Sequence, residues 1–389
     1  MILPLALTGG AASASPPAPA TIKHWGAFIG GLIDHTPYDL QLSPVPLSLP
    51  GRIAEIATSN SSQYALLTNG SLYAWGLGKN GQLGDGRTAN SFTRPVRVRF
   101  PAGVKIASIP IDAMPFDTAL AVDTTGHVWG WGFNTFGQLC LGNRTEYNTP
   151  VRLPLSHVTL LAGAGGHSLF DSRGRVYACG NNTYGELGNG SRRSSKVPVR
   201  VTGLRRGQVT SLVAAFANSG AVLANGKYYD WGYNRQGQVG NGVLGRPVDV
   251  PFRVRLPAAV RQLAQGGSLP GNGQTITLLA NGSLYVWGAG SAYQLGTGTT
   301  ANQPSPVRIF APRGVRYRLV ATGGGTSYGV STVGNVYAWG GNMVGEVGNG
   351  GTSNVRYPVR VASGATSISA TSSDVMISVR PRPCAAWVC

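Results

Sequence analysis

The sequence predicts an all-β protein made of seven copies of one four-stranded unit. Seven times along the 389 residues, a strand-like stretch ends in Trp-Gly or a close variant, at intervals of 48 to 56 residues. A fixed period in this range indicates an array of supersecondary units that bury their hydrophobic faces against one another. Almost no stretch has the 3.6-residue period of an amphipathic helix. Four short strands per copy, with the copies closed into a ring, is the description of a seven-bladed β-propeller.

The repeat is anchored by one position at the end of its third strand. That position is filled by Trp25, Trp75, Trp131, Cys179, Trp231, Trp287 and Trp339, each followed by glycine. Cys179 is the one departure from tryptophan in this series, and we expect it to occupy a core site suited to a small residue.

The second copy shows how the elements follow one another. Apolar runs at 64–67 and 72–75 are separated by Asn69-Gly70, which predicts a hairpin because glycine supplies the positive φ of a tight turn. A Gly-Gln-Leu-Gly turn follows at 81–84, and a Pro-Val-Arg-Val strand at 95–98 completes the copy.

These motifs resemble the regulator of chromosome condensation repeat family, whose blades carry the same Trp-Gly, Gly-Gln-Leu-Gly and Pro-Val sequences. The resemblance covers residues 21–389, with Cys179 in blade four and the lack of Gly-Gln-Leu-Gly after Trp25 in blade one as its departures. It implies one seven-bladed propeller domain. Plant ultraviolet photoreceptors of this family need a dense tryptophan cluster that this chain lacks, so we do not expect a light sensor.

Blade one is expected to be assembled from both ends of the chain. Residues 44–47 supply a late strand, and 375–379 followed by 384–387 resemble the two strands that precede Trp-Gly elsewhere. Closing the ring in this way removes open sheet edges. The segments 23–25 and 385–387 compete for a similar strand position, and the sequence leaves that competition open. Residues 1–20 are read as an N-terminal extension or the remnant of a targeting segment, with an apolar run too short for a complete signal peptide.

The composition favours an anionic partner. Lys and Arg number 32 against 14 Asp and Glu, which gives a net charge of +18, although only 12% of residues are charged. Nucleic acid, a ribonucleoprotein, an acidic protein or an anionic surface fits this balance. A GC-biased genome or an acidic habitat explains it equally well. No stretch approaches the length of a transmembrane helix.

An arginine recurs in the Pro-Val-Arg strand and forms what we call the arginine belt. Because side chains alternate along a strand, these arginines are expected to point the same way in six blades. They either contact phosphates or acidic protein, or protect exposed strand edges from pairing. The belt residues are Arg97, Arg152, Arg200, Arg253, Arg308 and Arg360.

Basic residues in loops are the second set of binding candidates. The pairs Arg192-Arg193 and Arg205-Arg206, together with Arg313, Arg316 and Arg318, are expected to form a patch because loops gather on one face. Solvated arginine clusters without a partner are the alternative.

The sequence offers no catalytic constellation, so we expect neither an enzyme nor a cofactor nor a metal site. The five histidines are scattered over separate copies, and no metal-binding spacing occurs. Cys384 and Cys389 are close enough for a local disulfide in an oxidising compartment. The compartment stays unknown, and export is an option if residues 1–20 belong to a longer signal.

The sequence is compatible with three functions. The first is a non-catalytic scaffold, part of a larger assembly, that engages an anionic partner through basic faces. The family resemblance also implies guanine-nucleotide exchange on a small GTPase. A secreted or surface protein-binding propeller, such as an enzyme inhibitor, is the third.

Overall fold

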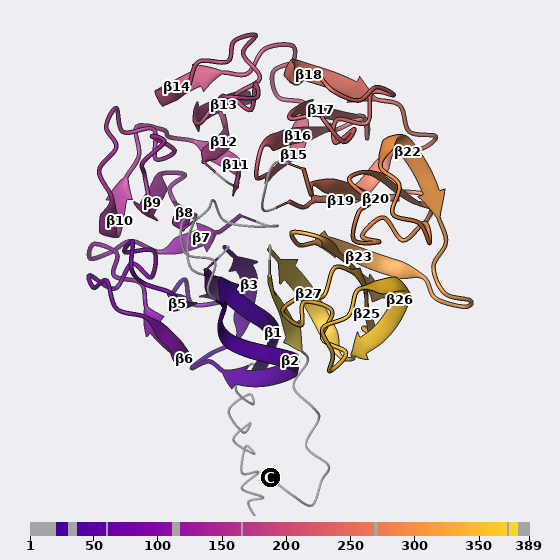
Figure 1. Ribbon diagram of the computed structural model, residues 1–389. Helices are drawn as coiled ribbons and strands as arrows, with labels where there is room; N and C mark the ends of the chain where they lie inside the picture. Colours follow the sequence, from indigo (N-terminus) through magenta and orange to yellow (C-terminus); the bar gives the residue numbers. More distant parts are fainter. Residues whose placement is uncertain are drawn as a thin grey trace, which may run out of the picture.

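The protein is described from a computed structural model, which covers residues 21–29, 37–59, 61–110, 117–164, 166–267, 271–371 and 373–379. Seven antiparallel four-stranded sheets stand around a common centre, which confirms the predicted propeller (Figure 1). Within each blade the first strand lies nearest the centre of the ring, and the fourth lies at its rim.

Blades are numbered here by the order of their Trp-Gly positions. Blade two contains β3 (Ile53–Thr58), β4 (Ser62–Leu67), β5 (Leu72–Gly76) and β6 (Ser91–Arg97). Blade three contains β7 (Ile106–Ser108), β8 (Thr118–Asp123), β9 (Val128–Gly132) and β10 (Tyr147–Arg152). Blade four contains β11 (Val158–Ala164), β12 (His167–Ser172), β13 (Arg175–Gly180) and β14 (Ser195–Arg200).

The next three blades repeat this order. Blade five contains β15 (Val209–Ala215), β16 (Asn218–Leu223), β17 (Tyr228–Gly232) and β18 (Val248–Val254). Blade six contains β19 (Val260–Gln265), β20 (Gln274–Leu279), β21 (Leu284–Gly288) and β22 (Gln303–Ile309). Blade seven contains β23 (Tyr317–Thr322), β24 (Thr326–Ser331), β25 (Val336–Gly340) and β26 (Val355–Ala362).

Blade one closes the ring with two strands from each end of the chain. Its order is β2-β1-β28-β27, so β27 (Ala365–Ala370) and β28 (Asp374–Val379) come from the C-terminal part. β1 (Thr21–Ile29) and β2 (Pro37–Ser48) complete the blade, and Trp25 pairs with Val375. Figure 1 shows indigo β1 and β2 beside yellow β27.

The predicted closure is therefore confirmed. Residues 375–379 form the second strand of blade one, as their likeness to the second strands of the other copies predicts, and 365–370, which the sequence reasoning did not assign, fill the innermost position. The third position, for which 23–25 and 385–387 compete in the sequence, is taken by Thr21–Ile29. Residues 384–387 lie outside the described residues.

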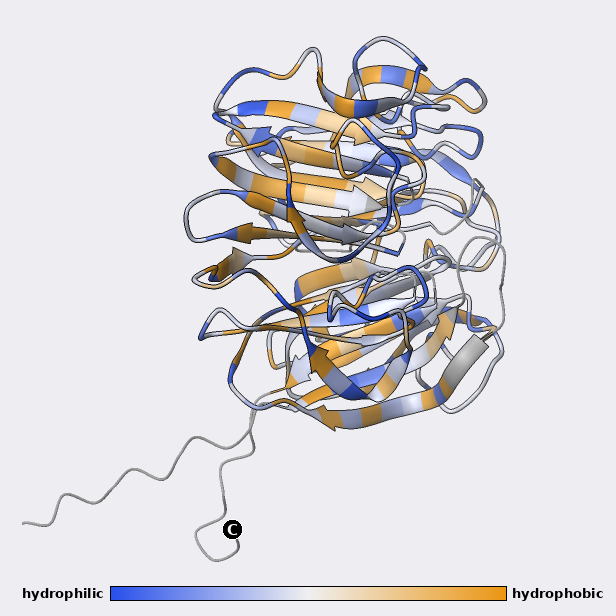
Figure 2. Ribbon diagram, turned by 90° about the vertical axis from the view of Figure 1, so that its left-hand side faces the viewer, coloured by the Kyte–Doolittle hydropathy of each residue, from blue (hydrophilic) through white to orange (hydrophobic). Residues whose placement is uncertain are grey.

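The strand sequences follow their burial. Each second strand from β4 to β24 is buried along its whole length, because it has a neighbouring strand on both sides and a blade against each face. The fourth strands are mostly exposed or half-buried. Viewed from the side, the strands carry most of the hydrophobic residues, while the connections emerge at both faces of the ring (Figure 2).

A glycine and a tryptophan meet at five junctions between consecutive blades. At one of them the Trp231 Nε1–H donates to the carbonyl oxygen of Glu186 at 2.8 Å. A Cβ at Gly188 would lie only 2.7 Å from that nitrogen, so the close approach requires glycine. The equivalent pairs are Gly84 with Trp131, Gly240 with Trp287, Gly296 with Trp339 and Gly348 with Trp25.

The junction between blades three and four replaces both partners with cysteine. Cys140 occupies the glycine position with a φ of 59°, and Cys179 occupies the tryptophan position. The two form a disulfide, with 5.6 Å between their Cα atoms, and both are buried. The expectation that Cys179 is a small core residue holds for its burial, but the sequence reasoning missed the bond. The predicted Cys384–Cys389 bridge lies outside the described residues.

The junction that follows blade one differs in another way. Blade one has no Gly-Gln-Leu-Gly turn, and the buried Trp75 Nε1 has no hydrogen-bond acceptor among the described residues. Trp131 and Trp231, by contrast, each donate to a carbonyl of the preceding blade's turn. Within the described residues, this junction therefore lacks the hydrogen bond from tryptophan to a turn carbonyl that Trp131 and Trp231 make.

Candidate functional surface

The antiparallel order of each blade divides the connections between two faces of the ring. The loops that join third to fourth strands, such as 77–90, lie on the side that we call the loop face, together with the turns that join first to second strands. The turns that join second to third strands, such as 68–71, lie on the opposite side, which we call the turn face. Each connection from a fourth strand to the next blade also lies there.

The arginine belt occupies equivalent positions in six fourth strands. All six belt arginines are exposed, and each lies at or near the end of its strand that is closest to the turn face. Each also pairs in register with an aromatic residue on the third strand. The pairs are Arg97 with Tyr73, Arg152 with Trp129, Arg200 with Tyr177, Arg253 with Tyr229, Arg308 with Tyr285 and Arg360 with Tyr337.

The loop arginines do not form the single patch that the sequence suggested. Arg192 and Arg193 lie in the long loop of blade four on the loop face, whereas Arg205 and Arg206 lie between blades four and five on the turn face. The expectation that loops gather on one face was wrong, because antiparallel blades send alternate connections to opposite sides. Arg313 and Arg316 lie on the turn face and are exposed, and Arg318 is half-buried.

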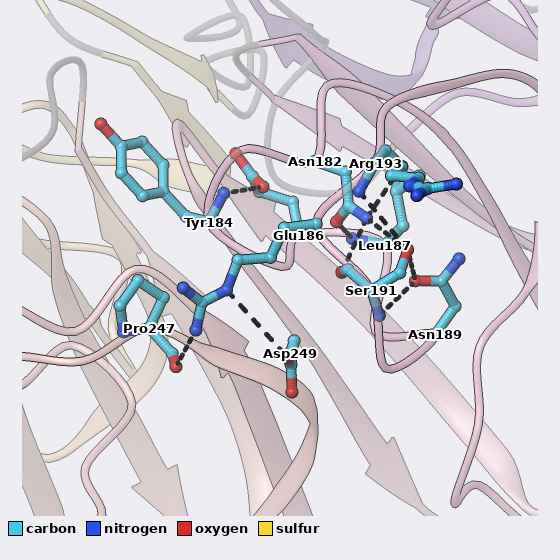
Figure 3. A network of polar contacts seen from close by, with 10 residues as sticks. Asn182, Tyr184, Glu186, Leu187, Asn189, Ser191, Arg193, Pro247 and Asp249 are labelled. Atoms are coloured by element: carbon cyan, nitrogen blue, oxygen red, sulfur yellow. Dashed lines mark hydrogen bonds and ion pairs between the residues drawn. The ribbon is translucent and has the colours of Figure 1, made fainter.

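Arg192 contacts Pro247 and Asp249 of the next blade, both of which are labelled in Figure 3. One of its terminal nitrogens donates to the Pro247 carbonyl at 3.2 Å, and its Nε lies 3.9 Å from Oδ2 of Asp249. Among the described residues, His127 with Asp123, at 3.6 Å, is a second pair between a basic side chain and a carboxylate. Within the same described part of the chain, none of the six belt arginines has a carboxylate within ion-pair distance.

Most carboxyl groups are buried inside the fold. Among the acidic residues whose burial is described, only Glu146 is exposed. Burial raises the pKa of Asp117 to about 6 and that of Glu186 and Asp374 to about 7. These groups accept hydrogen bonds from neighbouring side chains and backbone, as Asp374 does from Gln63 at 2.6 Å. Among the described residues, the exposed charged side chains are consequently almost all cationic.

Titratable groups do not gather into a reactive or metal-binding cluster in the described part of the chain. Its residues include no group of three or more His, Cys, Asp or Glu placed to hold a metal ion. His167 is buried, its Nε2 lies 2.8 Å from Ser219 Oγ, and burial lowers its pKa to about 4. It is therefore a neutral part of the junction between blades four and five. No helix among the described residues has the length and apolar character needed to span a membrane.

Comparison with known proteins finds relatives that share this repeat. Ultraviolet-B receptor UVR8 of Arabidopsis thaliana is 28% identical over 339 residues, which cover 86% of this chain and 63% of the receptor. The E3 ubiquitin-protein ligase HERC2 of Homo sapiens is 28% identical over 305 residues, which cover 75% of this chain and 6% of the ligase. The chain thus spans less than two thirds of the length of either relative.

Solved structures share the fold. Human WBSCR16 superimposes with a TM-score of 0.79 at 21% identity, over 94% of this chain and all of that one. Prp20p from Saccharomyces cerevisiae, a structure described with its binding to Gsp1p and histones, superimposes with a TM-score of 0.77 at 22% identity, over 93% and 92% of the two chains.

A family model for the regulator of chromosome condensation (RCC1) repeat matches five segments of the chain. They are residues 69–110, 125–170, 173–221, 281–330 and 333–374, which together make up more than half of the sequence. This protein therefore belongs to the RCC1 repeat family.

Proposed function

We propose that this protein is a non-catalytic binding scaffold, a subunit of a larger assembly that engages an anionic macromolecule through its exposed arginines. The separation of charge supports this proposal: most of the described carboxyl groups are buried, while the six belt arginines are exposed and lack a carboxylate within ion-pair distance. Such a surface attracts polyanions over a distance and releases their counterions on contact. Protection of strand edges accounts for a charged rim, but it does not require that the charges all have one sign.

The test is a fluorescence titration of the full chain against duplex DNA, duplex RNA and poly-glutamate at several salt concentrations. Neutralising six phosphates would make the logarithm of affinity fall with the logarithm of salt concentration with a slope of about −5. A variant with Arg97, Arg152, Arg200 and Arg308 changed to Gln should bind more weakly and with a shallower slope. Absence of binding to every polyanion at low salt would sink the proposal.

Guanine-nucleotide exchange on a small GTPase is the second candidate. Its support is the likeness of fold to Prp20p, whose structure is described with binding to Gsp1p. Fold alone is a weak guide to function. An exchange factor would bind its GTPase most tightly in the nucleotide-free state and accelerate nucleotide release, whereas the scaffold would do neither.

A further inference from the structure

The two faces of the ring differ in charge, and this difference indicates which one meets the partner. We infer that the partner is a nucleic acid and that the turn face binds its phosphate backbone. This inference rests on the proposed function and adds the face and the chemical class of the ligand.

The turn face is formed by paired segments from neighbouring blades. The Gly70 carbonyl accepts a hydrogen bond from Ile106 N, which joins the turn of blade two to the start of blade three. Gly126 with Val158, Gly174 with Gly207 and Gly226 with Val260 repeat this arrangement around the ring. The hydrogen bonds hold the connections that carry basic residues in fixed positions on the scaffold.

Exposed basic residues follow these connections around the ring. Beyond the nearby belt arginines, they include Arg99 and Lys105 before blade three, Arg205 before blade five, and Arg313 and Arg316 before blade seven. Positive charge is thus presented by several blades rather than by one loop. A phosphate backbone likewise offers negative charge along its whole length, since a duplex carries one charge per roughly 1.7 Å of its axis.

No described carboxylate on the turn face is exposed. Asp123 is buried beneath a turn, where its Oδ1 accepts from Thr125 N at 2.8 Å and its Oδ2 accepts from Trp129 Nε1 at 2.9 Å. Asp171 is also buried. Glu55 is half-buried and accepts from Ile109 N at 2.8 Å. The oxygens of Asp123 and Glu55 are thus engaged by donors within the fold, and the charged side chains that this face exposes are the basic ones.

The loop face has a different character. Its exposed Glu146 and half-buried Asp249 reduce the positive potential, and its long loops expose Val243, Leu244 and Met343. Protein interfaces usually have an apolar centre surrounded by polar groups, which is closer to this face than to the other. The turn face also exposes Phe310 and Val333, but exposed basic side chains outnumber them there, which suits the polar interfaces that proteins form with nucleic acids.

The turn face is also hollowed beside belt arginines. One depression of about 430 Å³ is lined by Arg97, Arg99 and Phe100, and another of about 430 Å³ is lined by Arg152. Near blade six, the Arg308 guanidinium lies 4.9 Å from the centre of the exposed Phe310 ring. Arginines that line such depressions can contact phosphate oxygens of a nucleic acid.

The experiment compares two variants that each lose four positive charges. The turn-face variant changes Arg99, Arg205, Arg313 and Arg316 to Gln, and the matched loop-face variant changes Lys79, Arg87, Arg193 and Arg235 to Gln. All eight residues are exposed. Both variants and the unmodified protein are titrated with a 30-base-pair duplex at several salt concentrations, after circular dichroism and thermal unfolding have confirmed that they are folded.

We expect the turn-face variant to lose at least tenfold in affinity and the slope against salt to become shallower by up to about four. The loop-face variant should lose less than threefold. Equal losses in the two variants, or a larger loss in the loop-face variant, would overturn the assignment of the face while leaving the proposed function intact. Binding to poly-glutamate but not to nucleic acid would overturn the ligand class, and no binding by the unmodified protein would refute the proposed function itself.

Discussion

Replacing Cys140 and Cys179 together tests whether the disulfide stands in for the glycine and tryptophan of the other junctions. The informative variant is Cys140→Gly with Cys179→Trp, which restores the pair present at five other junctions. The matched control is Cys140→Ala with Cys179→Ala, which removes the bond and supplies no indole. Alanine also keeps a Cβ at a residue whose φ is 59°, where glycine is favoured.

The expected magnitude follows from the size of the loop that the bond closes. The two cysteines are 39 residues apart. By the chain-entropy estimate, a loop of this size stabilises the folded state by about 4 kcal/mol at 25 °C. The loss of one hydrogen bond offsets part of this stabilisation, because the sulfur of a disulfide has no hydrogen to donate. The carbonyl oxygen of Gln138 lies 3.3 Å from Cys179 Sγ and so lacks the donor that a tryptophan or a free thiol would provide.

The assay is thermal and urea unfolding with and without a thiol reductant, with peptide mass spectrometry to confirm the Cys140–Cys179 bond. Ser replaces Cys384 and Cys389 in every variant, so that only one pair responds. Reductant should destabilise the parent protein by up to about 4 kcal/mol. The glycine-tryptophan variant should not respond to reductant and should be more stable than the alanine control. The reasoning is refuted if the glycine-tryptophan variant is no more stable than the alanine control, or if the parent does not respond to reductant.

Two further predictions concern buried polar groups. Burial raises the pKa of Asp374 to about 7, so its contribution to stability should be lost as the pH rises from about 4 to 7, by at most about 1.4 kcal/mol per pH unit. Asp374→Asn should flatten the dependence of unfolding free energy on pH, because it removes the titrating carboxyl group. Gln63 can turn its unpartnered Oε1 toward the new amide, so the hydrogen bond between the two side chains is kept. An unchanged pH profile would contradict this prediction. Trp287→Phe should cost about 1 kcal/mol more than Trp231→Phe in urea unfolding, since the carbonyl released by Trp231 keeps a second donor, Ser219 Oγ. Equal costs would show that this second hydrogen bond does not compensate.

The fold could be predicted because each strand and turn is encoded locally and then repeated. Glycine at the hairpin turns, alternating apolar residues and the Trp-Gly pair give the same answer in every copy. Closure could be predicted in outline, since a ring needs its first blade completed. The innermost strand of blade one, 365–370, could not be predicted, because its sequence Ala-Thr-Ser-Ile-Ser-Ala has only a weak apolar pattern.

The disulfide and the division into two faces could not be predicted from one copy of the repeat, because both depend on how neighbouring copies are placed. The position of Cys179 is informative only when it is compared with the glycine position of the preceding copy, which Cys140 fills. A contact between consecutive blades makes these positions neighbours, and one repeat read alone does not show it. Likewise, Arg193 and Arg205 are only 12 residues apart in the sequence, yet β14 (Ser195–Arg200) runs between them and delivers them to opposite faces.

The balance of charge also has an architectural origin, which bears on whether it is functional. In the Gly-Gln-Leu-Gly turns the side-chain carbonyl of Gln238 accepts from Gln236 N at 3.0 Å, and in blade four Glu186 accepts from Tyr184 N at 2.7 Å in the same place. Several of the carboxyl groups are therefore acceptors that the fold uses internally. Some exposed arginines, such as Arg192 and Arg206, donate to carbonyl groups within the fold, and removing many of the others should leave the blades intact. A surface charge that the fold does not require is available to a partner outside the chain, which is what the titrations at several salt concentrations test.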